Sequence, residues 1–120
     1  MADTSLNENR IGLLIWQTSN VWQSKIRKQL INFNISFNEY LILETVYKLS
    51  KSIADISQVD VAKHSFIDKS VVSAKLTQLQ NKKLINKMTP NDNRSNKLAL
   101  TKDGKMNVEK IISLVVEVEH

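Results

Sequence analysis

Hydrophobic positions in the first third of the chain recur at helical intervals. Six apolar residues lie four, seven, four, four and three positions apart: Ile11, Ile15, Trp22, Ile26, Leu30 and Phe33. These intervals keep all six on one face of an α-helix, because a helix makes one turn in about 3.6 residues. The pattern predicts a long amphipathic helix within residues 6–33.

Three further helices follow, and each begins with a residue that can cap it. Ser36 and Glu39 have the spacing of a capping box, in which each side chain binds the backbone amide of the other residue. Ser57 and Asp60 repeat that spacing before a helix of about eight residues, and Asp68 is a good N-cap for the next one. The helix that starts at Ser36 is apolar on most of its circumference, so we expect it at the centre of the core. The short turn before Asp68 predicts a helix-turn-helix.

The hydrophobic period changes after the fourth predicted helix. Residues 84–88 and 97–100 are of strand length, and the eight residues between them are rich in Asn, Asp, Ser and Pro. Such a composition favours a turn, so the two segments predict a β-hairpin with a polar tip. Thr101 then caps a last helix. The apolar stripe of that helix comprises Val108, Ile111, Val115 and Val118, widened by Ile112.

The order of these elements is that of a winged helix-turn-helix, a mainly α fold with a two-stranded β-wing. A chain of 120 residues has the size of one domain. Residues 36–101 can close a core by themselves, whereas the helices in 6–33 and 102–119 flank it with apolar stripes. Exposed stripes of that size rarely stay solvated, so we expect them to pair with the same helices of a second chain as dimerisation helices.

Composition narrows the classes of function. The chain has no cysteine, which excludes disulfides and thiolate metal sites, and its two histidines, His64 and His120, are too few for a His-rich metal site. Its longest charge-free run, between Arg10 and Lys25, is too short for a membrane span, and the polar, acidic N-terminus is not that of a signal peptide. We therefore expect a cytoplasmic protein that needs no cofactor and has no membrane contact.

Catalysis has little support in the sequence. Asp60, Asp68 and Asp103 all lie at predicted helix starts, where capping accounts for them. The chain has no glycine-rich phosphate loop and no serine–histidine–aspartate arrangement. We therefore expect a protein that is not an enzyme and has no catalytic residues.

Positive charge is concentrated in one stretch. Residues 60–105 hold ten Lys and Arg against four acidic residues, whereas residues 1–59 have a net charge of only +1 and residues 106–120 a net charge of −2. A basic segment that coincides with the predicted helix-turn-helix and wing indicates a polyanionic partner.

The segment Ile35–Lys105 resembles the MarR family of transcriptional regulators. The matching residues are Val61–Ala62, Asp68–Lys69–Ser70, Val72–Ser73, Leu79, Leu84–Ile85, Asp92–Asn93–Arg94 and Leu100–Thr101–Lys102–Asp103–Gly104. The family's wing signature is an Asp, one intervening residue and an Arg, followed by a strand and Leu-Thr-x-x-Gly. No single fragment is specific, but their order and spacing together are.

The resemblance implies a homodimer that binds double-stranded DNA. It also implies that Arg94 enters the minor groove and that Asp92 pairs with it and orients it. Members of the family often bind small aromatic or anionic effectors between the dimerisation and DNA-binding regions. The chain's larger aromatic residues are therefore candidates to line such a pocket, or else simply to pack: Trp16, Trp22, Tyr40 and Tyr47.

The residues themselves point to one face of the fourth helix as the DNA reader. Turning Val72, Leu76 and Leu79 inward directs a set of mostly small polar side chains outward, where they can approach base edges closely. This set comprises Lys69, Ser70, Ser73, Ala74, Thr77 and Asn81.

Two residues depart from the family pattern. Ala74 replaces a frequent Arg on the outward face, which removes one expected guanine reader. Lys83 replaces a glycine at the exit of the helix. The absence of that Arg supports a rival hypothesis, in which the chain is a winged-helix protein-interaction module or antirepressor without specific DNA binding.

Overall fold

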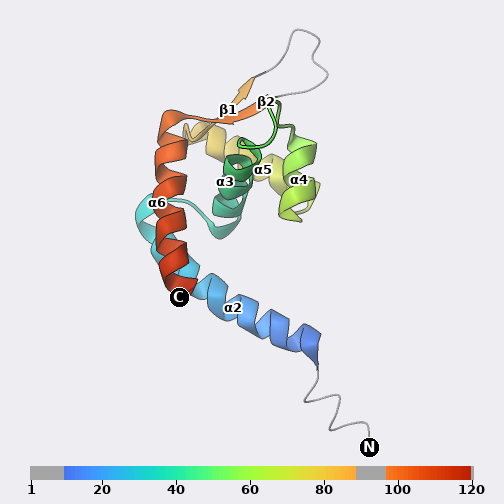
Figure 1. Ribbon diagram of the computed structural model, residues 1–120, viewed down its shortest axis with the longest axis vertical. Helices are drawn as coiled ribbons and strands as arrows, with labels where there is room; N and C mark the ends of the chain where they lie inside the picture. The colour runs from blue at the N-terminus through green and yellow to red at the C-terminus, as the bar shows by residue number, and fades with distance from the viewer. Residues whose placement is uncertain (1–9, 89–96, 120) are drawn as a thin grey trace, which may run out of the picture.

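The computed structural model describes residues 10–88 and 97–119, and it confirms the predicted mainly helical winged helix-turn-helix (Figure 1). Its elements are α2 (Ile11–Leu30), the 3₁₀ helix η1 (Ile31–Phe33), α3 (Phe37–Leu49), α4 (Gln58–Ser65), α5 (Lys69–Asn81), β1 (Ile85–Met88), β2 (Lys97–Leu100) and α6 (Lys102–Glu119). Helices α4 and α5 form the helix-turn-helix, and β1 pairs antiparallel with β2 to form the wing.

The predicted caps account for the helix starts. Ser36 Oγ accepts a hydrogen bond from the Glu39 amide at 3.2 Å, and Glu39 Oε1 accepts one from the Ser36 amide at 2.8 Å. Ser57 and Asp60 make the same two bonds at 3.1 and 3.0 Å. The Asp68 carboxylate accepts from the Ser70 amide at 3.1 Å. Because these bonds join residues two or three positions apart, the sequence alone specifies them.

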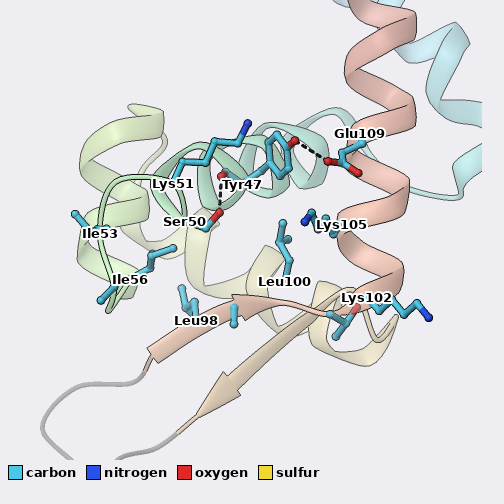
Figure 2. Close-up of a pocket in the computed structure, with 13 residues that line it drawn as sticks. Tyr47, Ser50, Lys51, Ile53, Ile56, Leu98, Leu100, Lys102, Lys105 and Glu109 are labelled. Carbon is cyan, nitrogen blue, oxygen red and sulfur yellow. Dashed lines mark hydrogen bonds between the residues drawn. The ribbon is translucent and has the colours of Figure 1, made fainter.

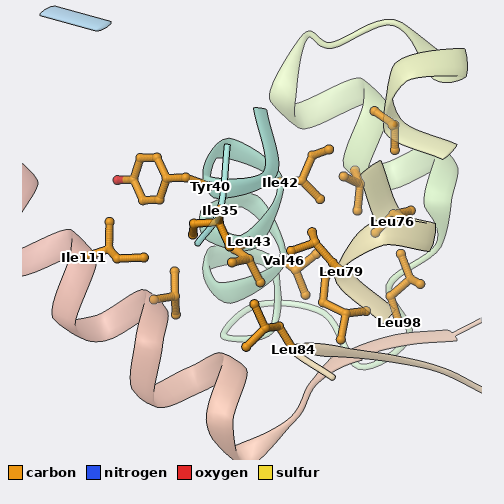
Figure 3. Packing of buried hydrophobic residues seen from close by; sticks show 14 of the residues in the cluster. Ile35, Tyr40, Ile42, Leu43, Val46, Leu76, Leu79, Leu84, Leu98 and Ile111 are labelled. Carbon is orange, nitrogen blue, oxygen red and sulfur yellow. The ribbon is translucent and has the colours of Figure 1, made fainter. Parts of the chain in front are cut away.

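Helix α3 lies at the centre of the core, as its apolar circumference predicts (Figure 3). Tyr40, Ile42, Leu43 and Val46 on this helix are almost completely buried. Around them pack side chains from every other helix and from both strands. Those with the least exposure include Ile26, Leu30, Val61, Val72, Leu79, Ile85, Val108 and Ile111.

Helix α5 ends in a left-handed turn that contains no glycine. Lys83 has φ +61°, its amide donates to the Gln80 carbonyl at 2.9 Å, and the Leu84 amide donates to the Leu79 carbonyl at 3.0 Å. This pair of bonds is the Schellman motif, and the buried side chains of Leu79 and Leu84 add its usual apolar contact. Lys83 thus adopts the conformation in which the family usually has glycine, although a side chain disfavours it.

Thr101 and Gly104 fasten α6 to the base of the wing. The Thr101 amide donates to the Leu84 carbonyl at 3.1 Å, its hydroxyl donates to the Lys83 carbonyl at 2.7 Å, and that hydroxyl accepts from the Gly104 amide at 2.9 Å. Gly104 is buried with its Cα against the Leu84 backbone, where a Cβ would overlap the carbonyl oxygen. The Leu-Thr-x-x-Gly motif therefore allows the backbone of α6 to pack closely against the backbone at the base of the wing.

The other side of the wing is tied to the segment before α4. The Leu98 amide donates to the Ile56 carbonyl at 2.8 Å, and the Lys97 ammonium lies 3.1 Å from the Asp55 carboxylate. Together with the turn at Thr101, these contacts hold β2 on both sides. The wing base is therefore rigidly placed beside the helix-turn-helix.

The sequence predicted that the apolar stripes of the flanking helices pair with a second chain, but several of their residues pack within this chain instead. Val108, Ile111 and Val115 of α6 and Ile26 and Leu30 of α2 are buried within this chain. Both α2 and α6 contact α3, because the apolar surface of α3 extends beyond the side that α5 covers.

The first half of α2 keeps its apolar side chains in solvent. It extends away from the rest of the molecule (Figure 1). We call this exposed segment, Ile11–Val21, the α2 arm. Its most exposed apolar residues are Ile11, Leu14, Ile15, Trp16 and Val21, all more than half exposed.

Candidate nucleic-acid interface

Helix α5 presents the polar face that the sequence predicts. Val72, Leu76 and Leu79 are buried against the core, which turns the opposite side of the helix to solvent. All of the predicted contact residues on this helix are exposed: Lys69, Ser70, Ser73, Ala74, Thr77 and Asn81. The structure therefore brings six of the eight predicted site residues onto one accessible helix surface.

Hydrogen bonds within the helix determine whether two of these hydroxyls can act as donors or as acceptors toward a ligand. Ser70 Oγ donates to the Asp68 carboxylate, and Thr77 Oγ1 donates to the Ser73 carbonyl at 3.2 Å. With their protons engaged, both oxygens face outward as acceptors. Acceptors of this kind suit the exocyclic amino groups of adenine and cytosine in a major groove.

Asp68 supplies a fixed negative charge at the start of this helix. The Ser70 hydroxyl and then the Ser70 amide stabilise its carboxylate, which lowers the pKa of Asp68 below its ordinary value. The ionised side chain caps α5 and interacts favourably with the positive end of the helix dipole. Asp68 therefore orients the first turn of α5, and Lys69 beside it restores local neutrality.

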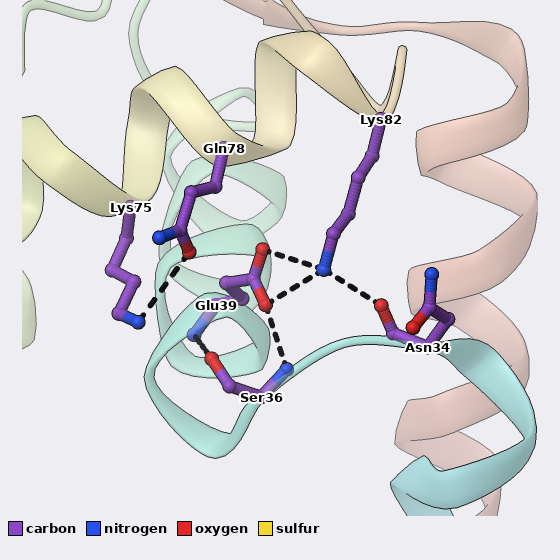
Figure 4. A network of polar contacts seen from close by, with 6 residues as sticks. All are labelled: Asn34, Ser36, Glu39, Lys75, Gln78 and Lys82. Carbon is purple, nitrogen blue, oxygen red and sulfur yellow. Dashed lines mark hydrogen bonds and ion pairs between the residues drawn. The ribbon is translucent and has the colours of Figure 1, made fainter.

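A buried ion pair, which sequence reasoning missed, fixes the other end of α5 (Figure 4). Glu39 is only 2% exposed, and its two oxygens lie 3.0 and 2.9 Å from the Lys82 ammonium. Lys82 also donates to the Asn34 carbonyl at 2.7 Å. The network joins the end of α5 to the start of α3. It also means that the ammonium of Lys82, counted among the basic residues of the segment, is engaged in contacts within this chain.

This ion pair predicts a pH-dependent stability. Burial raises the pKa of Glu39, but hydrogen bonds from the Ser36 amide and Lys82 outweigh it, so the pKa lies below its ordinary value. The ionised carboxylate of such a group stabilises the fold at pH values above its pKa in the unfolded chain, which is about 4.3. This stabilisation is lost as the pH falls through the pKa that the group has in the folded protein. We expect Glu39→Gln to cost about 1–2 kcal/mol of unfolding free energy at pH 7 and much less at pH 3.

Urea unfolding at pH 7, 5 and 3 measures this difference. Glu117→Gln is the matched control, because it makes the same change at an exposed position on α6. A penalty for Glu39→Gln that stays constant over this pH range would show that the carboxylate charge contributes nothing.

The remaining charge of the basic segment is mostly at the surface. Lys97 is paired with Asp55, as Lys82 is with Glu39. Six of the other lysines are exposed: Lys63, Lys69, Lys83, Lys87, Lys102 and Lys105. These residues come from α4, α5 and the turn after it, the wing and the start of α6.

Two predicted wing residues cannot be placed. Asp92 and Arg94 belong to residues 89–96, outside the described residues. The strands that lead to them are present, with Met88 paired to Lys97 at the last described position of the hairpin.

The four large aromatic residues do not gather in one pocket. Tyr40 is buried and donates to Glu44 at 3.0 Å. Trp22 packs edge-on against Phe37, with ring centroids 5.4 Å apart, and Trp16 on the α2 arm is 64% exposed. Packing therefore explains Tyr40 and Trp22.

Tyr47 lines an open groove of about 730 Å³ between the end of α3, β2 and α6 (Figure 2). Its hydroxyl donates to Glu109 at 2.8 Å, and the Lys51 ammonium lies 4.4 Å from its ring centroid. Lys102 and Lys105 also line the groove, whose apolar residues include Ile53, Ile56, Leu98 and Leu100. Sequence reasoning missed this groove because three distant segments build it.

Other candidate chemistry finds no cluster in the described parts of the chain. Among residues 10–88 and 97–119, no three His, Asp or Glu side chains lie together as ligands for a metal ion. His64 is exposed on α4. The helices of these two segments include none with the length and hydrophobicity required to cross a membrane.

Comparison with known proteins finds relatives that are described as transcription regulators. No family model matches the chain. An uncharacterised HTH-type transcriptional regulator of Bacillus subtilis, YdcH, is 26% identical over 109 residues, which cover 90% of this chain and 74% of the relative.

Solved structures show the same fold. Staphylococcus aureus MepR, a transcription regulator of the multidrug efflux pump MepA, has a TM-score of 0.76 and 27% identity over 90% of this chain and 78% of its own. Its complex with DNA has a TM-score of 0.78 and 26% identity, covering 88% and 75% of the two chains. Escherichia coli MarR, at 23% identity and a TM-score of 0.73, covers 87% and 75% and shares the fold.

These similarities extend over the helix-turn-helix, the wing and both flanking helices. The contacts of Thr101 and Gly104 are the structural counterpart of a motif that the sequence shares with one family, whereas Lys83 keeps the left-handed turn without the family's glycine. The chain therefore has the winged-helix fold of these regulators, and its sequence motifs are similar to those of the MarR family.

Proposed function

We propose that this protein binds double-stranded DNA sequence-specifically and regulates transcription as a homodimer. The observation that carries the proposal is the exposed face of α5, where six small or basic side chains project from a helix that is anchored at both ends. The structure of MepR in complex with DNA supports it, since that relative has the same fold.

The geometry supports different roles for α5 and for the lysines on the neighbouring elements. Small side chains such as Ser73 and Ala74 allow α5 to approach base edges in the major groove, and hydroxyl oxygens accept hydrogen bonds there. Exposed lysines on the neighbouring elements bind phosphates, which positions the helix without reading sequence.

Selection of bound duplexes from a random pool tests this proposal. We expect a two-fold symmetric consensus, with affinity that falls steeply as salt is raised. No enrichment, together with early elution from heparin, would instead favour the protein-interaction module that the absence of an Arg at Ala74 suggests.

The α2 arm supports the homodimer. Its exposed apolar face includes Leu14, Ile15 and Trp16, and a face of this kind is stabilised by burial in a second chain. Dimerisation would hold two α5 helices roughly 34 Å apart, one turn of DNA. Light scattering at micromolar concentration should give twice the 13.7 kDa chain mass; a species of single mass would contradict the dimer.

The groove beside Tyr47 supports a small aromatic or anionic effector. It combines an aromatic ring and an apolar floor with Lys51, Lys102 and Lys105, and it adjoins the wing base. Benzoate is a simple probe of this class. We expect it to raise the melting temperature and shift NMR signals of groove residues, with loss of both effects in Lys105→Ala.

Arg94 is proposed to contact the minor groove. A narrow A·T-rich groove concentrates negative potential, which attracts a guanidinium. Arg94→Ala should leave the melting temperature unchanged, weaken binding to the selected duplex by about 1–3 kcal/mol and lower the salt slope by about one unit. Asp92→Ala should weaken binding less, because the cation remains. Early melting with normal binding would show instead that Arg94 only stabilises the hairpin.

A further inference from the structure

Phe66, in the turn between α4 and α5, is unfavourably placed in two respects. Its side chain is 93% exposed, so the ring gains nothing from burial in this chain. Its backbone has φ +61°, a left-handed conformation that is rare for a bulky residue because the Cβ crowds the neighbouring carbonyl. Backbone outliers of this kind concentrate at functional positions.

The turn itself requires the left-handed conformation but not the ring. The Phe66 amide ends α4 by donating to the Ala62 carbonyl at 3.1 Å, and Ser65 Oγ accepts from the Ile67 amide at 3.2 Å. Neither bond involves the Phe66 side chain, and glycine would adopt the same backbone angles without strain. The fold therefore does not account for an aromatic side chain at this position.

The surroundings of Phe66 indicate what the ring contacts. It lies with Val59 and Ile67 along an open hollow of about 740 Å³, which Lys63, Lys69 and the helix-capping Asp68 also line. With two cations against one carboxylate, this apolar surface has a net positive charge, which fits a ligand that carries both an apolar group and phosphates. It is continuous with the exposed face of α5, since Lys69 belongs to both.

We propose that Phe66 is a specificity-determining residue that packs its ring against a thymine methyl group at the edge of the major groove. The inference rests on the proposed DNA-binding function. In a helix-turn-helix the first helix crosses the DNA backbone while the N-terminal residues of the second contact base edges, so the turn lies between phosphates and bases. The thymine methyl is the apolar group that the major groove offers there.

The test combines substitutions in the protein with substitutions in the duplex. Full-length wild type, Phe66→Gly and Phe66→Tyr are titrated against the duplex selected from the random pool. Each is also titrated against duplexes in which single thymines are replaced by uracil, which lacks only the methyl group. Lys83→Gly is the stability control, because Lys83 has the same φ of +61°.

Relief of the backbone strain should raise the melting temperature of both Phe66→Gly and Lys83→Gly by about 3–5 °C. Phe66→Gly should nevertheless bind the selected duplex about fivefold more weakly. Its salt slope should not change, because no charge is lost. At one thymine per half-site, uracil should weaken wild type and Phe66→Tyr but not Phe66→Gly.

Two results would overturn the inference while leaving the proposed function intact. One is wild-type affinity in Phe66→Gly; the other is a uracil effect of equal size in wild type and Phe66→Gly at every thymine. A change of oligomeric state in Phe66→Gly with normal DNA binding would assign the residue to a protein contact instead. If wild type enriches no duplex, the DNA-binding function itself is wrong and this inference falls with it.

Discussion

Replacing Gly104 with alanine is expected to lower the free energy of unfolding by about 2–3 kcal/mol, although it adds a single methyl group. The Cβ would overlap the Leu84 carbonyl oxygen, which is backbone and already accepts a hydrogen bond from the Thr101 amide. Relief requires α6 to move away from the wing base. That movement would lengthen the bond from the Gly104 amide to Thr101 Oγ1.

Gly12→Ala is the matched control, because Gly12 lies in α2 with no atom within 4 Å of the added methyl. Alanine is the better helix former, so this variant should be more stable by up to about 1 kcal/mol. Urea unfolding of both variants separates helix propensity from steric overlap. Equal stability of Gly104→Ala and wild type would show that α6 is not fastened to the wing as described.

Replacing Thr77 with glutamate is expected to weaken binding to the selected duplex by at least about 100-fold. Thr77 is exposed at the middle of the α5 face, and the only contact described for its hydroxyl is with the Ser73 carbonyl. A carboxylate there would face phosphates and base acceptors without a partner. The fold should be unaffected, because the buried side of α5 consists of Val72, Leu76 and Leu79.

Thr77→Gln separates charge from size, since glutamine has the same shape as glutamate and no charge. It should bind more weakly than wild type but clearly better than Thr77→Glu, and Ser73→Glu should behave like Thr77→Glu. Fluorescence anisotropy measures binding, and thermal melting confirms that each variant is folded. Wild-type affinity in both glutamate variants would mean that α5 is not the reading helix.

The sequence predicted the exposed face of α5 well because the signals for it were local. A capping residue and the apolar spacing of α5 determine which side of that helix is buried, and both act within a few residues. The exposed face from Lys69 to Asn81 followed directly. The wing was predicted for the same reason, because turn-forming residues lie between two strand-length segments.

The predictions that failed, or that were not made, concern contacts between distant segments. Lys82 was counted among the ten basic residues of the segment 60–105, yet it pairs with Glu39, 43 positions away. The α6 stripe was assigned to a second chain, yet α3 covers it. No pattern in the sequence shows which surface a neighbouring helix will cover.

The sequence by itself determined the order of elements, their starts, the buried stripe of each helix and the concentration of positive charge around the helix-turn-helix. These follow from hydrogen bonds and side-chain periodicity along a single segment. Only the tertiary structure decided which cations stay accessible, that the α2 arm remains uncovered, and that Phe66 faces solvent in a left-handed turn. The physical reason is that burial and ion pairing depend on which surfaces meet in space, and those surfaces come from segments far apart in the chain.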